Sequence, residues 1–348
     1  MIRISLLQFR VQALVAAAAL AAFAILLAVT GPHIASLYAA DGLASCHAGD
    51  CQNDAGYFSF QLAAGGYQAL YLVSIGIILF APAVIGLFWG APLIARELET
   101  GTAALAWNQS VTRTRWLAVK LATVGLTAMA VTEGLSLMQA WWAAPLGRAV
   151  GQGAPSSPLT QGRFTQLIFA SHGITPLGYA AFAFALGVTA GALIRRTIPA
   201  MAVTLAVFVA LQIATPLWIR PHFAPADHAA IAVIPGREAG GATGPGGTTL
   251  TLVATSLQGQ PGAWILSSGP VNAAGKPVSI TPAACAAPSV ATSPDFYSCL
   301  TSQGIKESVT YQPASRYWPF QWAETALYLA AALALAATSF RRLRRRLC

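Results

Sequence analysis

Residues 69–95 read ALYLVSIGIILFAPAVIGLFWGAPLIA, a stretch without a charged side chain. An α-helix needs about 20 apolar residues to cross the hydrocarbon core of a bilayer, and this stretch is long enough. Similar stretches occur at residues 11–30, 121–142, 173–194, 197–219 and 322–340. Within them Glu133 and Glu324 are the only charged residues. The sequence therefore predicts six membrane-spanning helices.

Composition supports the same conclusion for the whole chain. Of its 348 residues, 56% are hydrophobic and only 9% are charged, whereas soluble proteins carry about 25% charged residues. So few charges cannot cover the surface of an ordinary soluble enzyme. Intrinsic disorder is also excluded, because disordered chains are poor in apolar residues. We expect an all-α polytopic membrane protein.

The basic residues predict how the chain is oriented. The formal net charge is +9, and cytoplasmic loops carry an excess of Lys and Arg. An N-terminus in the cytoplasm puts thirteen of the 20 Lys and Arg on the inner side, including the pair 195–196 and the tail 341–346. The others are Arg148, Arg163, Arg220, Arg237, Lys276, Lys306 and Arg316. Six spans then place both termini in the cytoplasm.

Cysteine positions agree with this orientation. Cys46 and Cys51 fall in the first outer loop, and Cys285 and Cys299 fall in the long loop before the last span. Disulfides persist outside the cytoplasm, and partners within one loop close short rings. We therefore expect the disulfides Cys46–Cys51 and Cys285–Cys299, with Cys348 left reduced on the inner side.

The chain divides into three predicted regions. Residues 1–219 hold spans one to five with an inner loop at 96–120, residues 220–320 form an extracytoplasmic insertion between spans five and six, and residues 321–348 hold the sixth span and a basic cytoplasmic tail. The insertion is too long for a structureless linker. Turn residues at 241–247 and 268–270 separate alternating segments and predict a small β-rich cap. The expected strands lie at 249–257, 263–267, 278–281 and 308–312.

The polar residues outside the spans include a few candidates for metal or nucleotide binding. His222, Asp227 and His228 could supply metal ligands, but loop histidines are more often solvated, and Cys46, His47 and Cys51 lack a fourth ligand at zinc spacing. Residues 270–277 resemble a nucleotide-binding loop only superficially, because prolines replace its first glycine and its last hydroxyl residue. We predict no metal and no cofactor bound by this chain; any ATP and Mg would be bound by a partner.

Two acidic residues lie inside predicted spans. Glu133 is well inside the third span, where burial of a charge is expensive, so it should face protein or water. It either lines a substrate path or makes a structural hydrogen bond to a neighbouring helix, and the sequence does not favour one over the other. Glu324 begins the last span, and we expect it to reach the interface or to pair with Arg316.

The predicted inner loop has the most informative pattern. Residues 91–102 read APLIARELETGT, residues 107–116 read WNQSVTRTRW, and Lys120 follows. A glycine at 101 allows a break, and Thr102 can cap a following short helix. Taken alone, Glu97, Glu99, Arg113 and Arg115 would be ordinary solvated loop charges.

This pattern resembles the permease subunits of the type-2 ABC exporter family, particularly its actinobacterial members. The resemblance covers about 30 residues in the motif and extends over the chain in topology, although the long insertion before the last span departs from the family. It implies a homodimer of permease chains, two ABC ATPase subunits, and a bacterial plasma membrane. It also implies an ATPase-coupling element that contains Arg96, Glu97, Glu99, Thr102, Arg113 and Arg115.

Three classes of function remain open from the sequence. The first is a permease that exports a hydrophobic or amphipathic substrate such as a drug, lipid, peptide or metabolite. The second is a membrane-embedded enzyme, which would need acids and histidines gathered at the outer face. The third is a receptor or scaffold that binds through its cap. Nucleic acid is not needed to explain the basic charge, because the arginines can lie against anionic lipid headgroups.

Overall fold

The computed structural model of the chain describes residues 2–46, 51–99, 113–152, 162–233, 238–243, 249–254, 257, 260, 262–285 and 294–345. The described part is mostly helical, and six of its helical segments are long and apolar enough to cross a membrane. These candidate spans are Phe9–Ala40, Tyr67–Glu99, Arg115–Trp142, Thr175–Ile194, Thr197–His222 and Ala314–Arg342. They confirm the six predicted spans, and most extend further than the apolar stretches alone.

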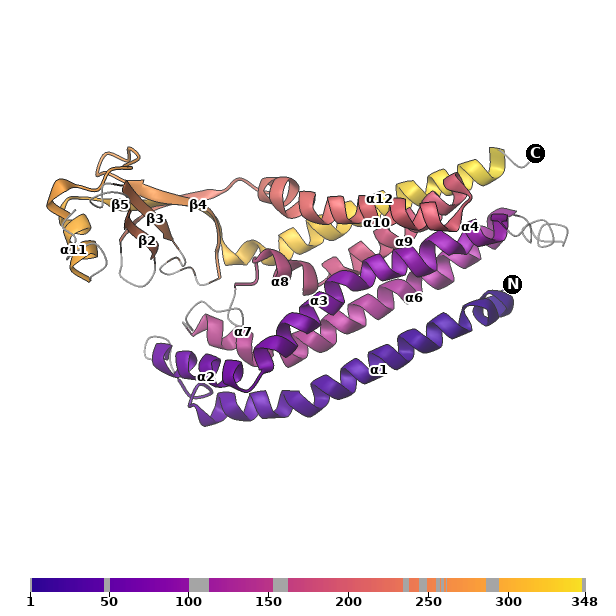
Figure 1. Ribbon diagram of the computed structural model, residues 1–348, viewed down its shortest axis with the longest axis horizontal. Coiled ribbons are helices and arrows are strands. Elements are labelled where there is room, and N and C mark those ends of the chain that lie inside the picture. Colours follow the sequence, from indigo (N-terminus) through magenta and orange to yellow (C-terminus); the bar gives the residue numbers. More distant parts are fainter. Residues whose placement is uncertain are drawn as a thin grey trace.

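The spans run lengthwise beside one another in a bundle (Figure 1). Its long helices are α1 (Ile2–Ala40), α3 (Tyr67–Ile85), α6 (Arg113–Trp142), α9 (Thr175–Ile194), α10 (Thr197–Ala214) and α12 (Tyr317–Arg345). Both chain ends lie at one end of the bundle, which we call the terminal end, and the strands lie beyond the other, the sheet end. Hence the turn between α9 and α10 and the end of α4 (Ala91–Glu99) belong to the terminal end.

Two spans contain π-helical turns. The second span consists of α3, the π turn η1 (Gly86–Gly90) and α4, in one continuous run. The fifth consists of α10, the π turn η2 (Thr215–Ile219) and the 3₁₀ turn η3 (Arg220–His222). Single π turns inside helices often mark functional positions. Here η1 leads directly into α4, which carries the Arg-Glu-Leu-Glu segment.

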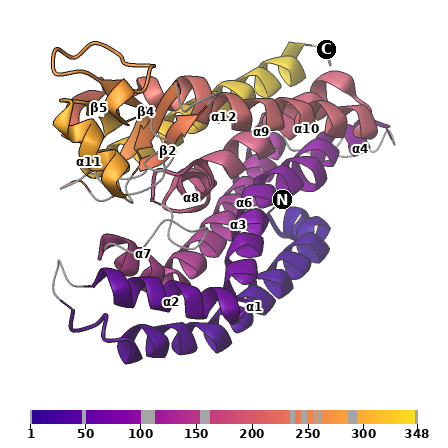
Figure 2. The same ribbon diagram turned by 60° about the vertical axis from the view of Figure 1, so that its left-hand side comes forward.

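The first helix continues beyond the bilayer thickness and helps to form a helical platform at the sheet end. With 39 residues, α1 is roughly 58 Å long at 1.5 Å per residue. Its end packs with α2 (Gln52–Ala64) and α7 (Ala144–Gly151), which lie beside it in Figure 2. Buried Ile34 of α1, Phe58 of α2 and Leu146 of α7 belong to one apolar cluster. The platform therefore occupies the region that the sequence analysis treated as a loop.

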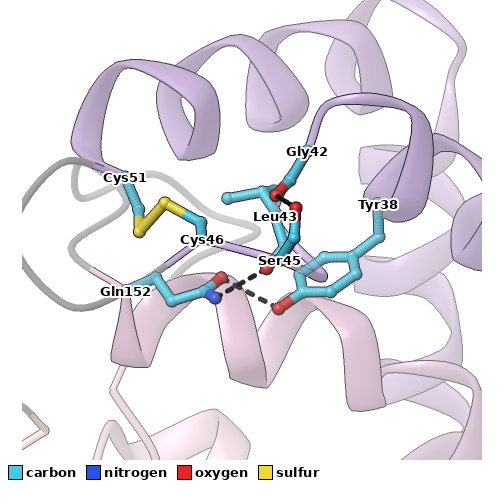
Figure 3. Close-up of a disulfide and its surroundings, with 7 residues drawn as sticks. All are labelled: Tyr38, Gly42, Leu43, Ser45, Cys46, Cys51 and Gln152. Carbon is cyan, nitrogen blue, oxygen red and sulfur yellow. Dashed lines mark hydrogen bonds between the residues drawn. A yellow bond between two sulfur atoms is a disulfide. The ribbon is translucent and has the colours of Figure 1, made fainter.

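A disulfide and an amide side chain fix the corner of the platform (Figure 3). Cys46 and Cys51 are bonded, as predicted. Gln152 accepts a hydrogen bond from the Tyr38 hydroxyl at 2.9 Å and donates one to the Leu43 carbonyl at 2.8 Å. The corner between α1 and α2 is thus held to the end of α7.

The sheet domain, residues 227–312, contains two antiparallel sheets. One has three strands in the order β1-β5-β4, and the other pairs β2 with β3. The strands are β1 (Asp227–Ala232), β2 (Glu238–Thr243), β3 (Thr249–Ala254), β4 (Trp264–Val271) and β5 (Lys306–Gln312). The short helix α11 (Pro294–Ser302) and the disulfide Cys285–Cys299, also as predicted, close a small core around Phe296.

The strand prediction missed β1 and β2 and was wrong in three further details. The segment 278–281 forms no strand and only a single bridge between Ile280 and Thr249. Residues 268–270 were expected to turn but belong to β4, where Pro270 is tolerated because β4 is an outer strand of its sheet. Gly241 was also assigned to a turn, yet it pairs with Thr251 in the β2–β3 ladder.

Candidate functional site

The segment expected to couple to an ATPase occupies α4 and the start of α6 at the terminal end. Ile94 and Ala95 are buried, while Arg96 on the next position is exposed. The two acids of α4 both contact neighbouring helices. Glu97 forms an ion pair with Lys120 of α6, and the Lys120 ammonium also lies 4.5 Å from the centre of the Trp116 ring. The α4–α6 contact thus depends on a half-buried carboxylate and a buried ammonium.

Glu99 contacts the next pair of helices. Its carboxylate accepts hydrogen bonds from the Thr197 backbone N–H at 2.9 Å and from the Thr197 hydroxyl at 2.6 Å. Thr197 is the first residue of α10, so the carboxylate caps the helix and faces the positive end of its dipole. Both acids that the sequence analysis treated as loop charges therefore hold α4 to the bundle.

The other residues expected to couple to an ATPase are Thr102, Arg113 and Arg115. Arg115 is exposed on the first turn of α6. Arg113 begins that helix. Thr102 lies outside the described residues. Among the described residues of this segment, the exposed basic side chains are Arg96 and Arg115, and the exposed acid is Glu99.

Glu133 lies in the middle of α6 and is half-buried. Its Oε2 atom is buried without a hydrogen-bond partner in the part of the chain that the structure describes. A carboxylate oxygen without a partner is costly inside a span. This observation does not decide between the two alternatives for Glu133, but it identifies an oxygen that could accept a bond.

A buried ion pair at the sheet end was missed by the sequence analysis. Glu324 of α12 accepts two hydrogen bonds from Arg220, Nε to Oε2 at 2.8 Å and Nη2 to Oε1 at 2.9 Å. The side chains are 1% and 0% exposed. The Tyr179 hydroxyl of α9 also donates to Glu324, and the Arg220 guanidinium lies 3.9 Å from the centre of the Phe169 ring. We call these four residues the ion cluster.

The expected pairing of Glu324 with Arg316 is therefore wrong. Arg316 instead pairs with Asp227 of β1 at 3.0 Å, in a partly exposed ion pair. Arg220 had been counted among the outer-loop charges, yet it is buried, and its guanidinium contacts Phe169 of α8 and Glu324 of α12. The available signal was that Arg220 and Glu324 each follow an interfacial tryptophan by two residues, Trp218 and Trp322.

Next to the ion cluster, Gln321 ties α12 to the start of α9. Its Oε1 accepts from the backbone N–H groups of Ile174 and Thr175, both at 3.1 Å. Its Nε2 donates to the carbonyls of Phe169 and His172 at 3.0 and 3.1 Å. The neighbouring His172 lies outside the spans, and burial lowers the pKa of its imidazole to about 4.

The residues considered for metal binding do not gather into a site. His222 contacts the Trp218 carbonyl through Nδ1, and His228 contacts the Thr310 hydroxyl. Asp227 is held by Arg316. No group of three or more potential metal ligands occurs within the described residues, while His47 lies outside them.

These features define a multi-pass helical membrane protein whose spans are joined by charged contacts at both ends. A family model described as "ABC-2 membrane transporter related" matches residues 17–220. The match covers more than half of the chain, which therefore belongs to this family and is a membrane transporter subunit. It includes Glu97, Lys120 and Tyr179 and ends at Arg220, before the sheet domain and Glu324. No curated protein and no solved structure matches the chain.

Proposed function

We propose that this chain is the permease subunit of an ABC exporter, in which a separate ATPase subunit hydrolyses ATP. The observation that carries the proposal is the family match over residues 17–220, because it includes the second to fourth spans, most of the first and fifth, and the Arg-Glu-Leu-Glu segment. The exported compound is hydrophobic or amphipathic. The chain itself performs no catalysis and provides the path across the membrane.

The ATPase binds at the terminal end. Exposed arginines gather there from several elements: Arg96 of α4, Arg115 of α6, Arg195 and Arg196 between α9 and α10, and Arg341 and Arg342 of α12. A positive excess is typical of the cytoplasmic side. This supports cytoplasmic termini in a bacterial plasma membrane and an extracytoplasmic sheet domain, where the two disulfides would persist.

The docking element consists of α4, residues 100–112 and the first turn of α6. Because α4 is held by Glu97 and Glu99 to α6 and α10, force applied to it reaches two other spans directly. Two copies of this chain and two ATPase subunits form the working unit. Glu133 lines the substrate path in this proposal, where its Oε2 atom, which has no hydrogen-bond partner among the described residues, could accept a bond.

Copurification tests the proposal. The tagged full-length chain, solubilised from its native membrane, should carry with it an ABC ATPase with vanadate-sensitive ATP hydrolysis. Charge reversal of the two exposed arginines, Arg96→Glu with Arg115→Glu, should remove that ATPase because it removes positive charge from the docking element.

Lys276→Glu provides the matched control, because Lys276 is exposed in the sheet domain, far from the terminal end. It should leave copurification unchanged. If no ABC ATPase accompanies the wild-type chain, the permease proposal is wrong. If the double reversal binds the ATPase as well as the wild type does, the docking element lies elsewhere.

A further inference from the structure

The fourth span, α9, is the central helix of the bundle. In the most apolar 18-residue stretch of α9, 72% is buried inside the protein, compared with 11% in the first span. It packs against α3, η1, α4, α6, α10 and α12. Protein interiors are close-packed, so a helix enclosed in this way cannot shift without moving its neighbours.

At the terminal end, α9 and the second span touch backbone to backbone. A Cβ atom on Gly187 would collide with the Gly86 carbonyl and the Ala91 nitrogen. A Cβ on Gly191 would lie 2.5 Å from the Ala91 carbonyl oxygen, also too close. Small residues four apart allow membrane helices to approach in this way. Ala91 is the first residue of α4, so this backbone contact holds the helix that carries the docking charges.

Four-residue spacing of glycines occurs on both sides of this contact. Gly86 and Gly90 bound the π turn η1; on α9, Gly187 faces both of them and Gly191 faces Ala91. Because the obstructing atoms are backbone atoms, no side-chain rotation can relieve a substitution here. The contact is therefore a rigid joint between α4 and α9.

At the sheet end, α9 is held to α12 by polar groups. Tyr179 donates to Glu324, and the first backbone amides of α9 donate to Gln321. A Cβ on Gly178 would lie 3.2 Å from the Thr325 Cα atom, so the backbones are close here as well. At the level of Gly187 and Gly191, the Thr189 hydroxyl lies 3.0 Å from the Ser339 hydroxyl of α12. These contacts join α9 and α12 along their length.

The ion cluster also stands where the chain enters and leaves the sheet domain. Arg220 precedes β1, and Glu324 lies about two turns into α12, the long helix that follows β5. Stacked aromatic rings connect the ion cluster to the sheet domain. The centre of the Phe164 ring lies 5.8 Å from the ring centres of both Phe169, in α8 (Gln166–Ser171), and Trp264, in β4. The domain is thus packed onto the bundle.

We propose that α9 is a rigid link that carries displacement of α4 at the terminal end through to the ion cluster, so that the sheet domain moves together with α4. That an ATPase subunit is what displaces α4 rests on the proposed function. The link itself is a property of this chain alone. The sheet domain is then a moving part of the transporter, attached at the far end of the same helix.

Hydrogen exchange of the full chain in lipid nanodiscs tests the link, because coupled elements share opening equilibria. Gly187→Ala overpacks the joint between α4 and α9. It should raise exchange by about tenfold in α4 and also in residues 172–179 and 317–325 at the sheet end. Coupling is reciprocal, so Glu324→Gln should raise exchange in α4 as well as around the ion cluster.

Gly76→Ala is the matched control, because a Cβ at Gly76 of α3 meets nothing within 4 Å. It should leave exchange at both ends unchanged. Gly125→Ala, whose Cβ would lie 3.2 Å from a Phe184 side-chain atom, provides a milder perturbation of α9 if Gly187→Ala does not fold. Exchange that rises only within a turn or two of each substitution would overturn the proposal.

The outcome is independent of the ATPase. Loss of ATPase copurification would refute the proposed function and leave the link intact. Local exchange changes in Gly187→Ala and Glu324→Gln would refute the link, whether or not an ATPase copurifies.

Discussion

The two ends of the bundle use acidic residues in different ways. At the terminal end, Glu97 is half-buried and Glu99 is exposed, and each contacts one neighbouring helix. At the sheet end, Glu324 is fully buried and contacts both Arg220 and Tyr179. Exposed contacts can be exchanged for water at little cost, whereas breaking a buried pair leaves a charge without solvation. The acidic contacts of the terminal end are therefore easier to exchange than the buried pair at the sheet end.

The largest predicted effect comes from breaking the buried pair. Glu324→Ala should lower the free energy of unfolding by about 3–5 kcal/mol, because Arg220 remains buried without its partner. The double variant Arg220→Met with Glu324→Leu should recover most of this loss. Denaturant unfolding of the purified chain in detergent would measure both.

Arg316→Gln is the comparison at the sheet end. It breaks the partly exposed pair with Asp227 and should lower the free energy of unfolding by less than about 1 kcal/mol. Equal effects of Glu324→Ala and Arg316→Gln would show that burial does not distinguish the two pairs.

Lys120→Met should have the largest effect at the terminal end. It leaves the Glu97 carboxylate without its cation, and we expect a loss of about 2 kcal/mol in the free energy of unfolding, as for a hydrogen bond to a charged group. Arg342→Gln, an exposed change at the same end, is the control and should be nearly neutral. If Lys120→Met lowers the free energy of unfolding as much as Glu324→Ala does, the ion pairs at the two ends contribute equally to stability, contrary to the comparison above.

Acidification should weaken the sheet end through His172. Its pKa is lowered to about 4 in the folded chain, below the ordinary value of 6.5, so the unfolded state binds the proton first. The stabilisation is complete above about pH 6.5 and is lost as the pH falls toward about 4. Between about pH 7.5 and about pH 5.5 the loss should be about 1 kcal/mol.

His172→Gln should remove this part of the pH dependence. Thermal unfolding of wild type and variant across the same pH range would measure it. Identical slopes for the two proteins would contradict the assignment to His172.

The smallest effect should follow Glu99→Gln. The amide keeps a hydrogen-bond acceptor for Thr197 but loses the charge that faces the α10 dipole. Because Glu99 is exposed, the change in melting temperature should be slight and should shrink further in high salt. A salt-independent effect would show that the charge is not what stabilises this contact.

Much of the fold could be predicted from local sequence. Apolar length alone located the six spans, since each must cover the same hydrocarbon thickness. Loop membership alone paired Cys46 with Cys51 and Cys285 with Cys299. Strand β1 was missed because its alternation is carried mostly by alanines, and β2 because it contains two glycines.

The contacts of the candidate site were less predictable. The sequence located Glu97 and Glu99 in the segment that resembles a coupling element, but it gave no sign that they bind Lys120 and Thr197. Which helical neighbour a charge meets depends on the rotation of each helix about its axis and on the order of helices in the bundle. Neither is encoded by hydropathy.

By itself, the sequence determined the membrane class, the number of spans, the disulfide partners and the family-like segment, because each depends on residues close together in the chain. The tertiary structure decided that Arg220 and Glu324 form one buried pair, that α9 is central, and that Gly187 meets Gly86 and Ala91. These contacts join residues about one hundred positions apart. They exist because close packing selects one arrangement of helices, and only that arrangement brings the charges and glycines together.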